Sequence, residues 1–168
     1  MSISEAVAHA SAYLTEHPNE ARYRDSPARA RLTDGLRVEV SGLAGETLTT
    51  DMPGGIGGGA SAPSPGWYFR AAAASCVAAL IGVRAGMLGA TLTPGSVEVG
   101  VDSESDDRGI LGLDGTIPAG ALSLRVVVSV ASQGLAREQI EAMARWAIDH
   151  WPVTDSARRA VPIEVIVS

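Results

Sequence analysis

The sequence contains no lysine and only one cysteine among its 168 residues. Without lysine, both Schiff-base chemistry and a phosphate loop that depends on lysine are excluded. The single thiol, Cys76, cannot form a disulfide within the chain. The N-terminal residues also lack the basic and apolar segments of a signal peptide. We therefore expect a protein of the reducing cytoplasm.

Aromatic residues are scarce, at 4% of the chain, although 46% of the residues are hydrophobic. The core must therefore be built from valine, leucine, isoleucine and alanine, and a partner subunit would help to complete it. The longest apolar run, residues 71–83, is rich in alanine and shorter than the roughly 20 residues of a membrane span. We interpret this run as part of a buried helix, and we expect no membrane association.

Positive charge is also in deficit, with 13 arginines against 19 acidic residues and a net charge of −6. A protein that neutralises the phosphates of a nucleic acid needs a basic surface, and this chain lacks one. Nucleic acid is therefore excluded as an expected partner.

Hydrophobic periodicity predicts an α+β domain. Ser2 and Glu5 have the spacing of a capping box before a first helix. The expected elements are a helix over residues 3–14, a polar connector, a hairpin of strands 36–40 and 47–50, a loop over 51–65, a helix over 64–88, strands 97–101 and 122–130 around an acidic loop at 102–109, an amphipathic helix over 140–148 that Pro152 ends, and a last strand over 163–167. The second helix is apolar on nearly all faces, so we expect it to be buried on all sides.

The glycine-rich loop offers a weak nucleotide-binding pattern. Gly55, Gly57 and Ala60 fit a degenerate G-x-G-x-x-A sequence, which in other proteins seats a pyrophosphate at a helix N-terminus. However, prolines separate this pattern from the next helix, and no acidic residue occurs between Asp51 and Glu98 to bind a ribose. The context favours a flexible loop.

Cys76 lies midway along the expected long helix. A lone cysteine in such a place is commonly an inert small hydrophobe, whereas a reactive thiol needs a positive neighbour that holds it as the thiolate. Within one helical turn the sequence offers only alanine, serine, valine and leucine. Any activating charge must therefore come from another segment.

The three histidines show no metal-binding spacing, so we expect neither a metal nor a cofactor. His150 ends the amphipathic helix, where it is either a cation at the negative end of the helix dipole or an acid or base in a pocket.

The order of these elements resembles the family of OsmC and organic-hydroperoxide-resistance (Ohr) proteins over nearly the full chain. The resemblance rests on AAAASC in the long helix, on the segment DDRGILGLDG and on HWPV at the end of the amphipathic helix. In the family the long helix begins with a proline followed by carboxylates and then carries the first cysteine. Pro65 and Cys76 hold those places here.

The resemblance implies an OsmC-like α+β fold in which antiparallel sheets wrap around long buried helices of two intertwined chains. The protein would then be a homodimer with a thiol site at each subunit junction. Residues 1–30 would form an N-terminal helix and connector, and residues 31–168 the OsmC-like domain. In active members, the first cysteine reduces an organic hydroperoxide and becomes a sulfenic acid, which a second cysteine traps as a disulfide.

This chain departs from the family pattern at several site positions. Trp151 stands where the resolving cysteine is expected, and Gly66 and Trp67 stand where carboxylates orient an activating arginine. We expect a pocket lined by Gly66, Trp67, His150 and Trp151, with Trp151 filling the space beside Cys76. Four arginines lie near the family's arginine in sequence, and no motif chooses between them: Arg22, Arg24, Arg29 and Arg31.

Two functions fit this degenerate site. In the first, Cys76 alone reduces a small-molecule hydroperoxide and an external thiol clears the sulfenic acid. In the second, the protein is not catalytic and binds an apolar small molecule at the dimer interface. A guanidinium within hydrogen-bonding distance of the Cys76 sulfur would favour the first.

Overall fold

The computed structural model describes residues 1–131 and 134–167. Contacts divide the chain into two compact units, one made of Met1–Ala10 with Arg70–Ser168 and the other of Ser11–Phe69. The architecture is α+β, with helices and two antiparallel sheets. The boundary that we predicted between residues 30 and 31 stays a prediction.

The first helix, α1 (Ile3–Glu16), confirms the predicted N-terminal helix. The Ser2 backbone N–H donates to the Glu5 carboxylate at 2.7 Å, and the Glu5 N–H donates to the Ser2 hydroxyl at 3.2 Å. These two bonds satisfy N–H groups that a helix start leaves without partners. A short 3₁₀ turn, η1 (Pro18–Ala21), follows.

A three-stranded antiparallel sheet forms from β1 (Arg29–Asp34), β2 (Arg37–Ser41) and β3 (Thr47–Thr50), in that order. Strands β2 and β3 are the predicted hairpin, and β1 arises from the end of the polar connector. Alternation places apolar residues on one face. Leu32 on that face is 64% exposed and Leu48 36%, so the face is incompletely covered within the single chain.

The long helix α2 (Pro65–Met87) runs between the predicted signals. The Ser64 hydroxyl accepts a hydrogen bond from the Trp67 N–H at 3.2 Å, which caps the start. After the helix ends, Gly89 adopts φ +67°, a left-handed conformation that glycine takes without strain. By length and composition α2 passes as a membrane span, a test that the core helices of soluble proteins also pass.

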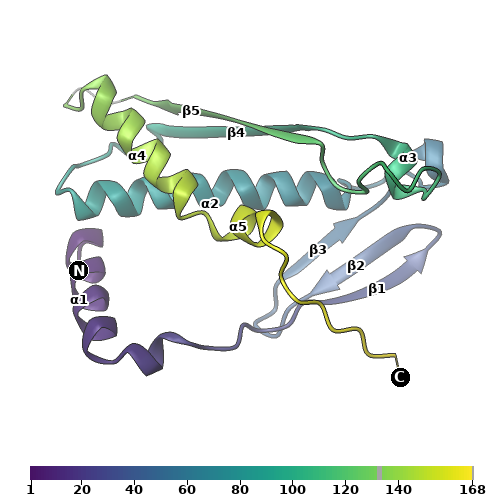
Figure 1. Ribbon diagram of the computed structural model, residues 1–168, viewed down its shortest axis with the longest axis horizontal. Coiled ribbons are helices and arrows are strands. Elements are labelled where there is room, and N and C mark those ends of the chain that lie inside the picture. The colour runs from purple at the N-terminus through teal and green to yellow at the C-terminus, as the bar shows by residue number, and fades with distance from the viewer. Residues whose placement is uncertain (132–133, 168) are drawn as a thin grey trace. The chain divides into compact units, whose positions relative to one another are not determined.

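Only one face of α2 is buried, so the predicted burial on all sides is wrong for the single chain. Figure 1 shows β4, β5 and α4 beside this helix. These elements cover a single side of α2. The buried residues of the helix therefore recur at every fourth position, which places them on one face. The buried residues are Ala73, Val77, Ile81 and Ala85.

The second sheet pairs β4 (Val97–Glu104) with β5 (Ser123–Val130) and carries the short helix α3 (Asp107–Ile110) between them. Strand β4 continues beyond its predicted end into the expected acidic loop. Asp102 is held there by pairing with Arg125, whose guanidinium lies 2.7 Å from its carboxylate. The valines on the inner face pack against the buried face of α2: Val97, Val99, Val101, Val126 and Val128.

The last helices are α4 (Arg137–Asp149) and α5 (Pro152–Arg158). Helix α4 confirms the predicted amphipathic helix. We predicted that Pro152 ends it, but α4 ends earlier and Pro152 begins α5. Proline suits the first position of a helix because its missing N–H would have no partner there.

The predicted C-terminal strand does not form within the described part of the chain. Residues 163–167 pair with no strand, and their apolar side chains are largely exposed, Ile163 at 87% and Val167 at 92%. The alternation is present in the sequence, but a strand also needs a partner edge.

Candidate functional site around Cys76

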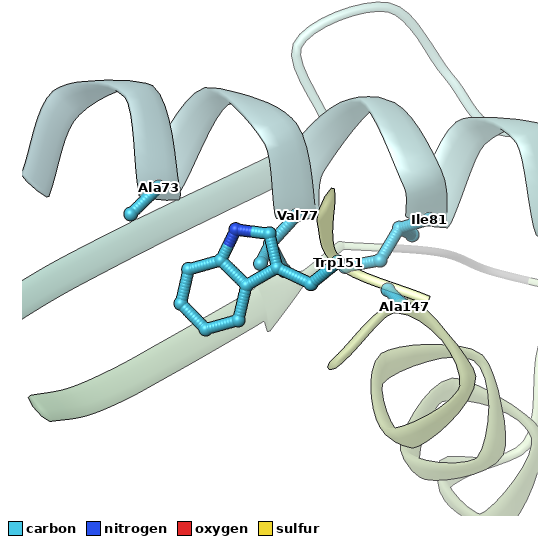
Figure 2. Packing of buried hydrophobic residues seen from close by; sticks show 5 residues of the cluster. All are labelled: Ala73, Val77, Ile81, Ala147 and Trp151. Carbon is cyan, nitrogen blue, oxygen red and sulfur yellow. The ribbon is translucent and has the colours of Figure 1, made fainter. Parts of the chain in front are cut away.

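A small buried cluster joins α2 to the end of α4 and the start of α5 (Figure 2). Trp151 is its largest member and is 4% exposed. The indole lies against α2, and the ring edge that carries its nitrogen faces the helix. The cluster consists of Ala73, Val77, Ile81, Ala147 and Trp151.

Cys76 is a free, partly buried thiol that packs against this cluster. Within residues 1–131 and 134–167, its sulfur takes part in no hydrogen bond or ion pair. The two arginines of α2 interact with other residues. Arg70 donates to the Ser103 hydroxyl at 3.2 Å, and the Arg84 guanidinium lies 5.2 Å from the centre of the Trp146 ring. Neither of them holds the Cys76 thiolate.

Trp151 precedes α5 as its N-cap residue. Its indole N–H is buried and has no hydrogen-bond partner among the described residues. Thr154, three residues later and 3% exposed, has a hydroxyl in the same condition. Two buried polar groups, three residues apart in the chain, therefore remain without hydrogen-bond partners among the described residues.

Of the other predicted pocket residues, His150 lies at the end of α4. His150 is exposed and stacks on Trp146, with ring centres 4.2 Å apart, while its Nδ1 donates to the Trp146 carbonyl at 2.8 Å. Gly66 and Trp67 lie in the first turn of α2 and belong to the other unit. The structure thus brings Trp151 to the cluster beside Cys76, and it turns His150 toward Trp146.

A buried carboxylate, which the sequence did not reveal, organises the glycine-rich loop. Asp51 is 3% exposed and follows β3 directly. One of its oxygens accepts from the Met52 and Gly59 N–H groups at 2.8 and 3.3 Å. The other accepts from the Ser61 N–H and hydroxyl at 2.9 and 2.7 Å. An aspartate at a strand end before a long glycine loop is the signal that would have suggested this role.

These contacts also bear on the nucleotide-binding pattern. The N–H groups of Gly59, within the pattern, and of Ser61, directly after it, donate to the carboxylate of Asp51. A bound phosphate would need such donors, and here an internal anion already occupies them. No group of three or more potential metal ligands occurs within the described residues.

We expect Asp51 to stabilise the protein in a pH-dependent manner. The Ser61 N–H and hydroxyl are the main cause that lowers the pKa of the Asp51 carboxyl from 3.8 to about 2, against the opposing effect of burial. Since the folded state favours the carboxylate, its stabilising contribution is complete above the usual pKa and is lost as the pH falls toward the lowered value. Asp51→Asn should therefore be less stable than the wild type at pH 7, with a difference that shrinks in that window.

Urea unfolding of both proteins between pH 7 and pH 2 measures this difference. Hydrogen exchange at the Gly59 and Ser61 amides, which donate to the carboxylate, should accelerate in Asp51→Asn at neutral pH. Parallel pH profiles for the two proteins would contradict the assigned role.

Comparison with known proteins agrees with this architecture. The family model for OsmC-like proteins matches residues 57–166, which include Cys76 and Trp151. No curated protein matches.

Solved structures share the fold at low sequence identity. A putative osmotic stress induced and detoxification response protein from Psychrobacter arcticus is 18% identical with a TM-score of 0.63, over 80% of this chain and 90% of that one. An organic hydroperoxide resistance protein from Legionella pneumophila is 22% identical with a TM-score of 0.60, over 82% and 91%. A putative organic hydroperoxide resistance protein from Vibrio cholerae, solved with captopril in one of its active sites, is 20% identical with a TM-score of 0.57, over 84% and 90%. Since the family model covers most of the chain and these structures share its fold, the protein belongs to the OsmC-like family.

Proposed function

We propose that this protein reduces organic hydroperoxides slowly, with Cys76 as its only reacting thiol and an external thiol as reductant. One observation carries the proposal: Cys76 packs against a buried cluster that Trp151 completes, where a second thiol would be needed for an internal disulfide. The family to which the chain belongs, and its structural relatives named for hydroperoxide resistance, support the choice of substrate class.

The proposed reaction needs no second cysteine. The Cys76 thiolate attacks one oxygen of the O–O bond, the bond breaks, and the other oxygen leaves with a proton as the alcohol. The sulfur, oxidised by two electrons, keeps the transferred oxygen as a sulfenic acid. An external thiol then condenses with this sulfenic acid and releases water, and a second external thiol frees Cys76 from the mixed disulfide. Such thiols are abundant in a reducing compartment, so we propose a cytoplasmic location.

In the described chain no guanidinium is hydrogen-bonded to the Cys76 sulfur, and for this reason we expect the proposed reaction to be slow. Only the thiolate is nucleophilic, and it forms readily beside a fixed cation. The arginines of α2 are engaged with Ser103 and with Trp146, and no charged group contacts the sulfur within the described part of its unit. The structure therefore supplies no fixed cation to assist the attack.

Intact-protein mass spectrometry after one equivalent of cumene hydroperoxide tests the proposal. We expect a gain of one oxygen atom, and peptide mapping should place it on Cys76 and not on one of the four methionines. A chain whose thiol has been alkylated beforehand serves as the control. If the wild-type thiol remains unmodified after prolonged exposure, the proposed activity is wrong.

A second function, binding of an apolar small molecule, is favoured by the residues around the cluster. Leu80 and Val153 are partly buried and pack against it together with Cys76. Such a site would take a hydrophobic ligand without chemistry at the thiol. A ligand that raises the melting temperature equally in the wild type and in the alkylated protein, with no oxidation of Cys76, would favour this second function. Gly66, Trp67 and His150 remain proposed pocket residues, assigned by resemblance to the family.

We also expect the protein to be an obligate homodimer. Most of α2 outside its single buried face remains accessible in the single chain, and the apolar C-terminal residues Ile163 and Val167 are exposed. A second copy would remove this apolar surface from water. Sedimentation velocity at micromolar protein concentration should give a single dimeric species. A stable monomer under those conditions would contradict this expectation.

A further inference from the structure

Trp151 offers the cluster beside Cys76 one hydrogen-bond donor that nothing in the described chain uses. The indole N–H can donate and cannot accept, and it is buried with no partner. A buried donor without an acceptor costs free energy, and such groups in native proteins therefore have a function or an unseen partner. The donor thus indicates a place for an acceptor atom.

The position of this donor relates it to Cys76. The nitrogen-bearing edge of the indole faces α2, where the ring lies against Ala73 and Val77 (Figure 2). Cys76 is three residues after Ala73 and directly before Val77, and side chains three apart are neighbours on a helix. Its thiol packs against the same cluster. An atom bound to the Cys76 sulfur would therefore enter the neighbourhood of the free N–H.

A second buried polar atom without a partner lies three residues after Trp151 in the chain. Thr154 is 3% exposed, and its hydroxyl has no partner among the described residues. A hydroxyl can donate or accept, so it complements an indole that only donates. The indole N–H, which belongs to an apolar cluster, suits an oxygen atom carried on an apolar molecule.

We propose that the indole N–H of Trp151 binds the oxygen atom of an organic hydroperoxide, of its alcohol product or of the Cys76 sulfenic acid. For the hydroperoxide and the sulfenic acid, this inference rests on the function proposed above; for the alcohol, it stands without that function. Trp151 then occupies the place of a resolving thiol in a different role. Its N–H donates a hydrogen bond to the oxygen of the Cys76 sulfenic acid until an external thiol arrives.

Binding of the alcohol can be measured on the wild-type protein by NMR of its indole N–H groups. In the ¹⁵N-labelled full chain, the three tryptophans give three indole N–H signals, and Trp151→Phe assigns one of them. Cumyl alcohol, which has no oxidising power, should move the Trp151 signal downfield and leave those of Trp67 and Trp146 in place. An unmoved Trp151 signal, or equal shifts of all three, would overturn the inference. If Trp151→Phe does not fold, Trp67→Phe and Trp146→Phe assign the signal by elimination.

The lifetime of the sulfenic acid is the second readout. After one equivalent of cumene hydroperoxide, a cyclic 1,3-diketone added at increasing delays traps the sulfenic acid that remains, and mass spectrometry quantifies it. Trp151→Phe keeps an aromatic ring but removes the N–H, and should shorten the lifetime about tenfold, the effect of one hydrogen bond. Trp146→Phe, the matched control, should keep the wild-type lifetime.

These outcomes separate the two proposals. Equal lifetimes in the wild type and Trp151→Phe would overturn the role of the N–H and leave Cys76 as the reacting thiol. If the wild type forms no sulfenic acid, the proposed function fails, and the response of the Trp151 signal to cumyl alcohol still decides whether the N–H binds oxygen.

Discussion

Replacing Cys76 with serine is expected to remove all hydroperoxide-dependent consumption of a monothiol above the rate without protein. Serine is nearly the same size, so the packing against the cluster is kept, but a hydroxyl does not supply the sulfur that accepts the oxygen. With cumene hydroperoxide and a monothiol, the wild type should turn over slowly and Cys76→Ser not at all.

The nature of the reductant sharpens this prediction. A lipoyl-type dithiol is not expected to support multiple turnovers, because the chain has no second thiol to form the internal disulfide that such a reductant resolves. Excess hydroperoxide without a monothiol should instead drive Cys76 beyond the sulfenic acid to irreversible products. Rapid Cys76-dependent turnover with the dithiol would refute the degenerate-site interpretation. Equal rates for wild type and Cys76→Ser would leave ligand binding as the better account.

Replacing Trp151 with alanine is expected to destabilise the protein by about 3–5 kcal/mol, the usual cost of truncating a buried tryptophan. Trp151 is 4% exposed and is by far the largest side chain of its cluster. Its removal would leave a cavity between α2 and the α4–α5 connection, which surrounding alanines are too small to fill. Urea unfolding at one fixed protein concentration measures the loss, since association would make the apparent stability depend on concentration.

Trp67→Ala is the matched control for this substitution. It removes the same side chain from a position that is 48% exposed, so the expected loss is only about 1 kcal/mol. A loss at Trp151 no greater than that at Trp67 would show that the cluster does not depend on its indole. It would also remove the geometric basis for placing Trp151 beside Cys76.

The elements that were predicted correctly have local signals. The Ser2–Glu5 capping box marks the start of α1, and Ser64 marks the start of α2. Alternating valines in β5 and the apolar spacing of α4 likewise depend only on neighbours in sequence. For this reason the sequence predicts these helices and strands close to where they form.

The errors concern what a distant segment supplies. The composition of α2 does not tell whether one face or all faces are covered, because the covering segments are far away in sequence. The alternation at Ile163 and Val165 is that of a strand, but in the described chain these residues pair with no other strand. Pro152 was interpreted as the end of one helix although a proline equally begins another.

The candidate site was predictable only in part. The positions of Cys76 and Trp151 followed from a resemblance that spans the chain, and the structure places both at one cluster. Asp51 escaped prediction because its partners are mostly backbone N–H groups, which every sequence has. The free indole N–H could not be foreseen either, since it depends on which acceptors three-dimensional packing leaves out of reach.

The three tryptophans stand in three unlike surroundings, and this gives the protein a built-in optical signal. Trp151 is enclosed by aliphatic side chains and should fluoresce at short wavelength, whereas Trp67, 48% exposed, should emit at long wavelength. Trp146 stacks against His150 and lies under the Arg84 guanidinium, so charge and ring contact should quench it. Blue emission therefore belongs mainly to the indole of the cluster against which Cys76 packs, and changes at Cys76 become visible without any attached label.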